Sequence, residues 1–270
     1  MELAAVLLTD DTFSRFSLWM RERTGVHLPP SKKPLLMQRL GKRLRARSLD
    51  SYEDYFEVLR QQEEEQERQI AVDLLTTHET SFFREPAHFA WLESLLQDWP
   101  AGTPLSLWCA AASTGEEVWS LAMTLADNLS GQTAWQVLAS DVSLACLEQA
   151  RRGHYALERC GGIGQERLRR HCLKGVEKQA GSMLIGKALR QRVLFRCINL
   201  DQPLPPIGPF RVIFMRNVLI YFDPATKNKV VRQATAQLAS GGFLVVSHSE
   251  SLYGLQEELK LVAPGVYRKP

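Results

Sequence analysis

The sequence predicts an α/β fold preceded by an all-α domain, and three observations support this prediction. Residues 10–75 repeat their apolar positions with the period of a helix and contain no strand pattern. From Pro104 onward, apolar segments typical of buried strands alternate with helical segments. Residues 156–192 interrupt this alternation with a basic, weakly patterned segment. We therefore expect a helical domain over 1–77 and an α/β domain over 78–270, with a small β-subdomain, a short meander, inserted at about 156–192.

The first domain is expected to be a small bundle of four amphipathic helices. The first helix, DDTFSRFSLWMRERTG, begins at acidic and threonine capping residues and stops at Gly25. Its apolar side is expected to carry Phe13, Phe16, Leu18 and Trp19. The second lies within PPSKKPLLMQRLGKRLRARSLD, where Leu36, Leu40 and Leu44 form an apolar stripe beneath a basic face. The segments SYEDYFEVLRQ and EQERQIAVDLLTTH supply the other two helices.

The second domain is expected to contain a mostly parallel sheet covered on both faces. Its strands are expected in LSLWCAA, AWQVLASD, RVLFRCINL, FRVIFMRNVLIYF and FLVVSHSE. Helical patterns separate them, in GEEVWSLAMTLADNL, SLACLEQARRGHY and PATKNKVVRQATAQLAS. Nearly continuous apolar strands joined through helices are typical of parallel sheets that are buried on both sides.

Composition excludes several classes of protein. No apolar run in the 270 residues reaches the roughly 18 residues that a membrane span needs, so no membrane insertion is expected. The beginning, MELAAVLLTDD, has no basic segment before its apolar run, and no signal peptide is expected. The five cysteines are scattered without a CxxC pair, which indicates neither a disulfide framework nor a zinc site and fits a cytoplasmic protein without a metal.

Positive charge is concentrated in two regions despite the net charge of only +3. Residues 31–50 contain seven Lys or Arg against Asp50 alone, and residues 151–196 contain twelve against three Glu. Such regions are typical of contacts with nucleic acid, an anionic membrane or an acidic protein. For either region alone, a solvated basic face is the simpler interpretation.

Polar residues follow two of the expected strands, where a parallel sheet places its ligands. The first strand runs into AAASTGEE, whose small side chains allow a close approach to the backbone, and the second ends at Asp141. Acids at the helix start, including Glu117, disfavour a pyrophosphate and suit a cationic or hydroxyl-bearing ligand. A nucleoside with a positive group, such as S-adenosylmethionine, fits this pattern. From these residues alone, a helix-start charge at Glu117 and an N-cap at Asp141 are an equally good interpretation.

Several of these segments together resemble the chemotaxis receptor methyltransferases, the CheR family. The resemblance covers nearly the whole chain and rests on TTHETSFFRE, AAASTGEE, LASD, CINL, MRNVLIYFDP and GGFLVVSHSESL…VYRK. It implies a small helical domain followed by a Rossmann-like methyltransferase domain with a β-subdomain insertion. It also implies that the protein forms methyl esters on glutamate side chains of bacterial chemoreceptors and converts S-adenosylmethionine to S-adenosylhomocysteine.

The resemblance also implies roles for individual residues. Cofactor binding is implied for His78, Thr80, Arg84, Glu117, Asp141, Asn199, Leu200, Asn217 and Val218. His78 departs from the family, whose members commonly have Asn there, so the pH dependence of binding can differ. The basic helix is implied to recognise the receptor's acidic helices through Arg39, Lys42, Arg43 and Arg45. In some members the β-subdomain also grips a peptide tether at the receptor's C-terminus.

Methyl transfer to a glutamate needs alignment and desolvation more than a general base. A glutamate has a reference pKa of about 4.3 and is already ionised at neutral pH. We expect the guanidinium group of Arg84 to bind a carboxylate through two nitrogens. We also expect Tyr221 to position a reacting group, and Phe82 or Phe83 to form an apolar side of the pocket.

Two alternatives remain open. One is a methyltransferase of the same fold that acts on RNA or a small molecule. The basic insert lacks the interleaved aromatic residues that stack on bases, so no nucleic acid is expected. The other is a non-catalytic adaptor that binds the cofactor without turnover.

Overall fold

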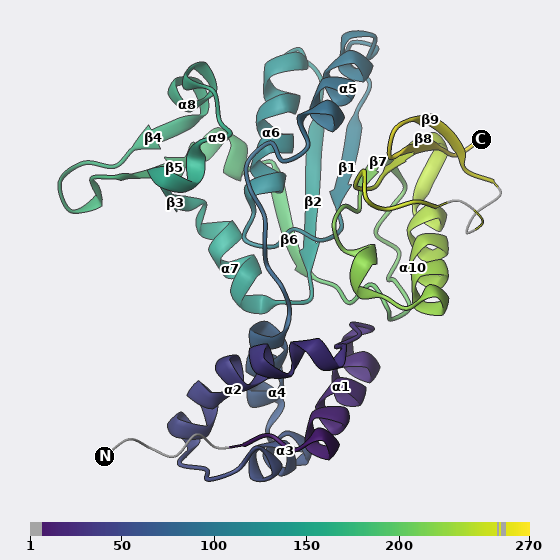
Figure 1. The fold of residues 1–270 in the computed structure, drawn as a ribbon. Coiled ribbons are helices and arrows are strands. Elements are labelled where there is room, and N and C mark those ends of the chain that lie inside the picture. The colour runs from purple at the N-terminus through teal and green to yellow at the C-terminus, as the bar shows by residue number, and fades with distance from the viewer. Residues whose placement is uncertain (1–6, 253, 255–257) are drawn as a thin grey trace. The chain divides into compact units, whose positions relative to one another are not determined.

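The computed structural model describes residues 7–252, 254 and 258–270, and it divides the chain into two units (Figure 1). The first unit extends to Thr77 and also includes the later segment Tyr221–Thr226. The second contains His78–Ile220 and Lys227–Pro270. Residues 1–6, which form half of the segment inspected for a signal peptide, lie outside the described residues.

The first unit contains the four expected helices. They are α1 (Asp10–Thr24), α2 (Lys33–Arg47), α3 (Tyr52–Arg60) and α4 (Glu65–Leu75), with a 3₁₀ turn, η1 (Pro30–Lys32), before α2. Side chains cap two of them: Thr9 Oγ1 accepts from the Thr12 N–H, and Ser51 Oγ accepts from the Asp54 N–H. Gly25, with φ 76°, ends α1 as the sequence predicts.

The core of this unit follows the apolar stripes, with one correction. Leu36, Leu40 and Leu44 of α2 are all buried, which confirms the predicted stripe. On α1, Phe13 and Phe16 are buried, but Leu18 is 55% exposed, so its assignment to the apolar side was wrong. Met20 fills the core instead, because positions 13, 16 and 20 share one face of a helix and position 18 lies about 200° from 16.

The second unit is built on a seven-stranded sheet in the order β6-β2-β1-β7-β8-β10-β9. The five parallel strands are β1 (Leu105–Cys109), β2 (Trp135–Asp141), β6 (Val193–Cys197), β7 (Phe210–Phe214) and β8 (Leu238–Val245). At one edge, β10 (Val266–Arg268) and β9 (Lys260–Ala263) pair antiparallel. The mostly parallel sheet is therefore confirmed.

Both faces of the central strands are covered. Neighbouring residues of a strand point to opposite faces, and Leu107 and Trp108 of β1 are both fully buried, as are Val212 and Ile213 of β7. The helices of this part of the chain are α5 (Pro86–Gln97), α6 (Glu116–Asn128), α7 (Leu144–Arg152) and α10 (Pro224–Ala236). The prediction of a sheet buried on both sides is thus confirmed.

Several predicted boundaries were wrong; the strand expected in FLVVSHSE, residues 243–250, is β8, which begins at Leu238 and ends at Val245. The strand expected over 210–222 ends at Phe214, because Asn217 adopts φ 56°, which a strand cannot accommodate, and Leu219–Tyr221 forms a 3₁₀ turn. The helix expected through residue 155 ends at Gly153, and β3 (His154–Ala156) follows. The last predicted helix ends at Ala236, because residues 238–240 begin β8.

Between α7 and β6 lies a small antiparallel sheet in the order β3-β5-β4. Its other strands are β4 (Cys172–Lys174) and β5 (Ser182–Ile185), and the short helical segments around them are η2 (Leu157–Cys160), α8 (Gln165–His171), η3 (Glu177–Gln179) and α9 (Lys187–Arg190). The last strand lies in the middle, so the sheet is not the predicted meander. It leaves β4 as an edge strand.

Much of the insert's basic charge is used in ion pairs within the second unit. Arg159 pairs with Glu116, and Arg167 pairs with Glu93 and Asp127 at 2.5 and 2.8 Å. Arg170 also reaches Asp127, at 2.7 Å. These pairs hold the insert against α5 and α6, and they weaken the interpretation of the region as a continuous nucleic-acid surface.

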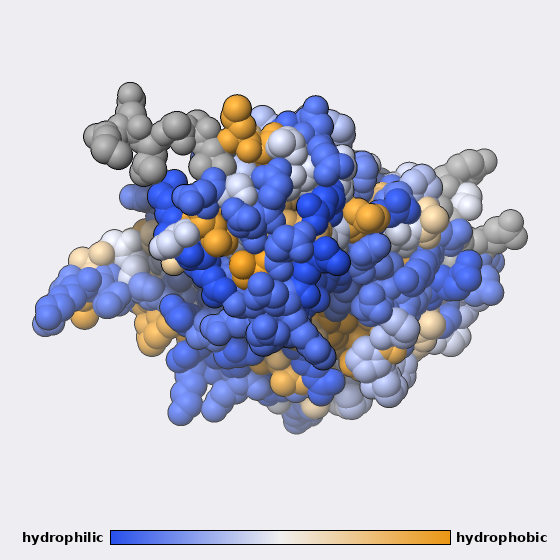
Figure 2. All heavy atoms as spheres, turned by 90° about the horizontal axis from the view of Figure 1, so that it is seen from below, coloured by the Kyte–Doolittle hydropathy of each residue, from blue (hydrophilic) through white to orange (hydrophobic). Residues whose placement is uncertain are grey.

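The surface is largely hydrophilic where Figure 2 shows it, and its hydrophobic side chains form small separate groups. None of the helices formed by the described residues is long and apolar enough to cross a membrane.

Candidate functional site

The candidate site lies at the carboxyl ends of the parallel strands of the large sheet. The neighbouring strands β6, β2, β1 and β7 are parallel, so their carboxyl ends lie on the same side of the sheet. The chain passes from β1 to β2 and β6 on one side and returns to β7 and β8 on the other. This reversal of strand order next to β1 is where α/β sheets bind ligands.

The loop after β1 is shaped by a glycine. Gly115 has φ 98°, and a Cβ at this position would lie 2.7 Å from the Tyr155 hydroxyl and 2.7 Å from the Ala150 Cβ. No side chain fits there, so α6 can begin directly against α7. Two residues earlier, Ser113 adopts φ 47° and directs its N–H toward the next strand.

Asp141, at the end of β2, receives that N–H. Its Oδ2 accepts from the Ser113 N–H at 2.8 Å, and its Oδ1 accepts from the Ser143 N–H at 2.9 Å. Burial raises the pKa of Asp141, against the lowering effect of these N–H groups and of His78. The His78 carbonyl accepts from Ser113 Oγ at 3.0 Å. The structure thus brings together His78, Ser113 and Asp141, two of which the sequence predicts for the site.

Glu117, at the start of α6, is bound by Arg216. The Arg216 side chain is fully buried and donates from Nη1 to Glu117 Oε2 at 2.5 Å. Its Nη2 donates to the Arg84 carbonyl at 2.6 Å and lies 3.3 Å from Glu85 Oε2. Arg216 therefore connects the end of β7, the start of α6 and the segment before α5.

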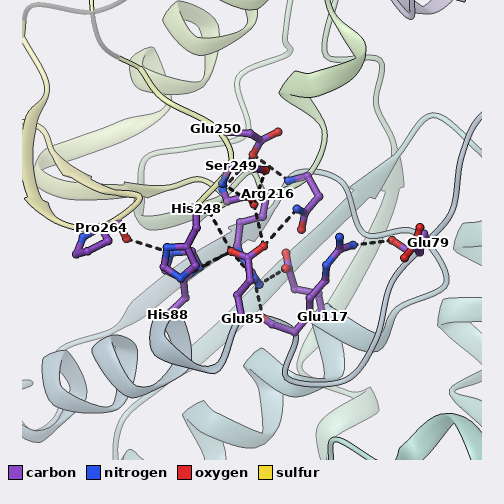
Figure 3. Close-up of polar contacts among 12 residues, drawn as sticks. Glu79, Glu85, His88, Glu117, Arg216, His248, Ser249, Glu250 and Pro264 are labelled. Carbon is purple, nitrogen blue, oxygen red and sulfur yellow. Dashed lines mark hydrogen bonds and ion pairs between the residues drawn. The ribbon is translucent and has the colours of Figure 1, made fainter.

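Glu85 is the acceptor at the centre of this network (Figure 3). Its Oε1 accepts from Ser247 Oγ at 2.8 Å and from Asn217 Nδ2 at 3.3 Å, and its Oε2 accepts from the His248 N–H at 3.1 Å. Burial alone would raise the pKa of Glu85, but these hydrogen bonds, together with the charge of Arg216, lower it to about 2. Glu85 is therefore ionised throughout the neutral range.

Two histidines lie against Glu85. His88 is buried, with its Nδ1 3.5 Å from Glu85 Oε2, and His248 is partly exposed, with its Nε2 4.0 Å from the same oxygen. The two rings lie 4.2 Å apart between centroids. Burial, with the positive charge of Arg216, lowers the pKa of His88 to about 4. His88 is thus neutral at physiological pH.

The segment TTHETSFFREP only partly forms the predicted pocket. Arg84 is half-buried and donates from Nη1 to the Glu79 carbonyl at 3.1 Å. Phe82 is buried in the core, edge-on to Tyr155 at 5.1 Å, and Phe83 packs against Phe89 at 5.0 Å. Both phenylalanines thus pack with the core of the unit, and neither contact supports their expected role as a pocket wall.

The other predicted cofactor residues follow the same strand ends. Asn199, two residues beyond β6, accepts the Asp201 N–H on its Oδ1 at 2.9 Å, and Leu200 is buried. Asn217 donates its N–H to Glu250 at 2.9 Å. Thr80 and Val218 are half-buried. Tyr221 belongs to the first unit, where its carbonyl accepts from the His27 N–H at 2.9 Å.

The four basic residues predicted to bind substrate fall into two pairs. Arg39 donates to the carbonyls of Leu74 and Thr76, and Arg43 binds Glu67 through Nε and Nη2 at 2.8 and 2.7 Å. Lys42 and Arg45 are exposed. Of the four, Lys42 and Arg45 are therefore best placed to meet a partner, while Arg39 and Arg43 hold the helices of the first unit together.

Sequence reasoning missed the central roles of Arg216, Glu85, His88 and His248. One signal was visible, because an arginine inside the apolar run VIFMRNVLIYF must find a partner when buried. Its partners were not visible, because Glu117 lies 99 residues away and the Arg84 carbonyl 132 residues away. No local pattern reveals such distant pairs.

Comparisons with known proteins cover nearly the whole chain. The model of the CheR methyltransferase SAM-binding domain matches residues 78–267, and that of the CheR methyltransferase all-alpha domain matches residues 11–76. The match to the all-alpha domain lies within the first unit, and the match to the SAM-binding domain covers most of the second unit together with Tyr221–Thr226 of the first.

Individual relatives align along almost their full length. A chemotaxis protein methyltransferase of Salmonella typhimurium is 36% identical over 262 residues, which are 96% of this chain and 90% of the relative. Its counterpart in Escherichia coli is 36% identical over 96% of this chain and 91% of its own length. Chemotaxis protein methyltransferase 2 of Pseudomonas aeruginosa is 38% identical over 92% of this chain and 90% of its own.

Proposed function

The chain belongs to the CheR methyltransferase family, and from this we propose that it transfers a methyl group from S-adenosylmethionine to glutamate side chains of bacterial chemoreceptors. The observation that carries the proposal is the placement of Asp141, Asn199, Glu117 and Asn217. Asp141 ends β2, and Asn199 and Asn217 lie just beyond β6 and β7. Glu117 lies at the start of the helix after β1, so all four belong to the carboxyl ends of neighbouring parallel strands. Its place of action is the cytoplasm, where the receptor helices to be methylated lie.

The residues at this edge fit an adenosyl cofactor with a cationic group. Asp141 is half-buried next to a loop of small residues, and its carboxylate can accept from ribose hydroxyls. Glu117 is held in place by Arg216, and its carboxylate at the start of α6 can accept a hydrogen bond from the cofactor. The acids Glu116 and Glu117 occupy the start of α6, the positive end of the helix where a pyrophosphate group would otherwise bind. His78, Thr80, Asn199, Leu200, Asn217 and Val218 complete the proposed contacts.

The proposed reaction is an in-line displacement in which the protein positions and desolvates the nucleophile. S-adenosylmethionine supplies a methyl group on a sulfonium, which a carboxylate can attack directly. Arg84 is half-buried, and two nitrogens of its planar guanidinium can bind the two oxygens of a carboxylate. We propose that it aligns the glutamate of the substrate or the carboxylate of the cofactor, and that Tyr221 assists in positioning.

A direct test combines calorimetry with a transfer assay. Titrating the full chain with S-adenosylmethionine should give one binding event, and tritiated cofactor should label the cytoplasmic fragment of a chemoreceptor at glutamates. Asp141→Asn should weaken cofactor binding about tenfold or more, because a hydroxyl loses its anionic acceptor. Cofactor binding without labelling would favour a non-catalytic adaptor, and labelling of RNA instead of receptor would contradict the proposed substrate.

We expect Lys42 and Arg45 to contribute to receptor binding. The double variant Lys42→Ala/Arg45→Ala should bind a receptor fragment roughly tenfold more weakly, with a smaller salt dependence, because two exposed cations are lost. Affinity for S-adenosylmethionine should not change. Arg43→Ala is unsuitable for this test, because it would leave the buried Glu67 without its bidentate partner.

A matched control removes two exposed arginines from other helices. Arg60→Ala/Arg232→Ala takes the same charge from α3 and α10. Equal losses of receptor binding in both double variants would mean that net charge matters and that α2 does not form a specific surface.

We also propose that β4 takes up a C-terminal receptor peptide as an additional strand. As an edge of the small sheet, β4 offers backbone groups for pairing; Leu173 within it is 59% exposed, and Val176 just after it is 69% exposed. Leu173→Asp should weaken binding of such a peptide, measured by fluorescence anisotropy, at least about fivefold. Leu144→Asp, at another exposed leucine, in α7, should have no effect, and a loss there of the same size would contradict the assignment.

A further inference from the structure

We propose that Glu85, His88 and His248 form a binding site for a divalent transition-metal ion, with zinc as the best chemical match. One carboxylate oxygen and one ring nitrogen from each histidine all lie within 4.8 Å of one another. Figure 3 shows the three side chains converging from the start of α5 and the loop after β8. This site lies beside the proposed methyl-transfer site, since Glu85 follows Arg84 in the chain and accepts from Asn217, but no step of the transfer is assigned to the metal.

The distances are close to those of a coordinated ion. Ligands at about 2.0–2.1 Å from a tetrahedral zinc lie roughly 3.3 Å from one another. The Glu85 oxygen already lies 3.5 Å from His88 Nδ1 and 4.0 Å from His248 Nε2. The largest separation exceeds the ideal by at most ~1.5 Å, and His248, whose side chain is exposed, is the ligand with room to move closer.

The strongest evidence is a buried nitrogen without a hydrogen bond. His88 is only 1% exposed, and its Nε2 lies 3.1 Å from the Pro264 carbonyl. A carbonyl only accepts, so Nε2 carries the hydrogen, and in the neutral ring Nδ1 has a lone pair. That Nδ1 has no hydrogen-bond partner and faces the Glu85 carboxylate. Two facing acceptors repel each other, and a cation between them would satisfy both.

The contact with Pro264 is the support that a metal-binding histidine usually has. Ligating histidines donate their second ring N–H to a carbonyl or carboxylate, which fixes the tautomer and the ring orientation. The turn between β9 and β10 is shaped for this contact: Gly265 has φ 72°, and a Cβ there would lie 2.8 Å from His88 Nε2. The β9–β10 turn therefore holds His88 with Nδ1 directed toward Glu85.

The charges near the site favour a cation despite the presence of Arg216. Its short ion pair is with Glu117 at 2.5 Å, and its contact with Glu85 is longer, at 3.3 Å. Two carboxylates thus share one guanidinium, which leaves one negative charge for an ion at Glu85. Two imidazole nitrogens and one carboxylate oxygen are a ligand set that zinc accepts, and zinc in such a set takes water as its fourth ligand.

Metal binding to the full chain tests the proposal directly. After treatment with a chelator, protein carrying Cys197→Ser, which removes the exposed thiol, is titrated with zinc chloride by calorimetry. We expect one equivalent to bind. Cobalt(II) should give visible d–d absorption, and zinc should raise the melting temperature, because it binds the folded state alone. His248→Ala in the same background should weaken zinc binding at least tenfold and abolish the melting shift.

The control variant is His27→Ala, which removes an exposed histidine from the first unit. Its zinc affinity should equal that of the parent protein. If His88→Asn folds, its zinc affinity should fall as that of His248→Ala does. If it does not fold, the zinc affinity of His248→Ala alone decides between the outcomes. The proposal is overturned if the parent protein binds zinc no better than His248→Ala, or if His27→Ala causes the same loss.

Discussion

Arg84→Ala should reduce methyl transfer to a receptor fragment by about a hundredfold or more while leaving the fold intact. The loss follows from removing a preorganised charged donor at the reacting carboxylate, an effect of this order in other enzymes. The fold should survive because the Arg84 side chain makes one hydrogen bond, to the Glu79 carbonyl. The contact with Arg216 uses the backbone carbonyl of Arg84, which alanine retains.

Single-turnover transfer from labelled cofactor measures this effect, and melting temperature confirms the fold. Arg84→Lys keeps the positive charge but loses the planar guanidinium group that can bind a carboxylate through two nitrogens. Its activity should therefore lie between that of Arg84→Ala and that of the parent protein. If Arg84→Ala turned over at the parent rate, the assignment of Arg84 to the reaction would be wrong.

Arg216→Met should have the largest effect on stability, lowering the free energy of unfolding of the second unit by about 3–5 kcal/mol. Methionine fills much of the same space but leaves Glu117, which is buried, and Glu85 without their cation. Urea unfolding followed by tryptophan fluorescence reports this unit, because five of the six tryptophans belong to it and only Trp19 belongs to the other.

Arg211→Met, in β7 five residues before Arg216, is a close control. Arg211 donates to the Ser240 carbonyl at the surface, so its loss should change stability by no more than about 0.5 kcal/mol. Equal effects of the two substitutions would show that the buried network around Arg216 contributes little to folding.

The fold could be predicted from the sequence wherever one period governs a long segment. Leu36, Leu40 and Leu44 repeat every four residues and are buried, as expected. The prediction for Leu18 was wrong because hydrophobicity alone does not show which face of a helix is buried. The strand expected through residue 222 was too long because the backbone turn at Asn217 leaves no trace in an apolar run.

The candidate site could be predicted only as a set of separate residues. The edge of the sheet was foreseeable, since Asp141 and Asn199 directly follow strands. Its electrostatics were not, because the pairing of Glu117 with Arg216 and the approach of His88 and His248 depend on tertiary packing. The cysteine pattern gave no indication of a metal, and the proposed ligands contain no cysteine.

The segment Tyr221–Thr226 has a consequence for how the chain acquires its structure. Although it follows most of the second unit in sequence, it belongs to the first, where Asp223 pairs with Arg21 at 2.7 Å and the Tyr221 carbonyl binds the His27 N–H. On the ribosome, the first unit therefore lacks part of its structure until residue 226 has emerged. A chain that begins at residue 78 would still contain Tyr221 and Asp223 but would lack their partners His27 and Arg21. Removing the helical unit therefore also alters the segment Tyr221–Thr226, which stays in the shortened chain.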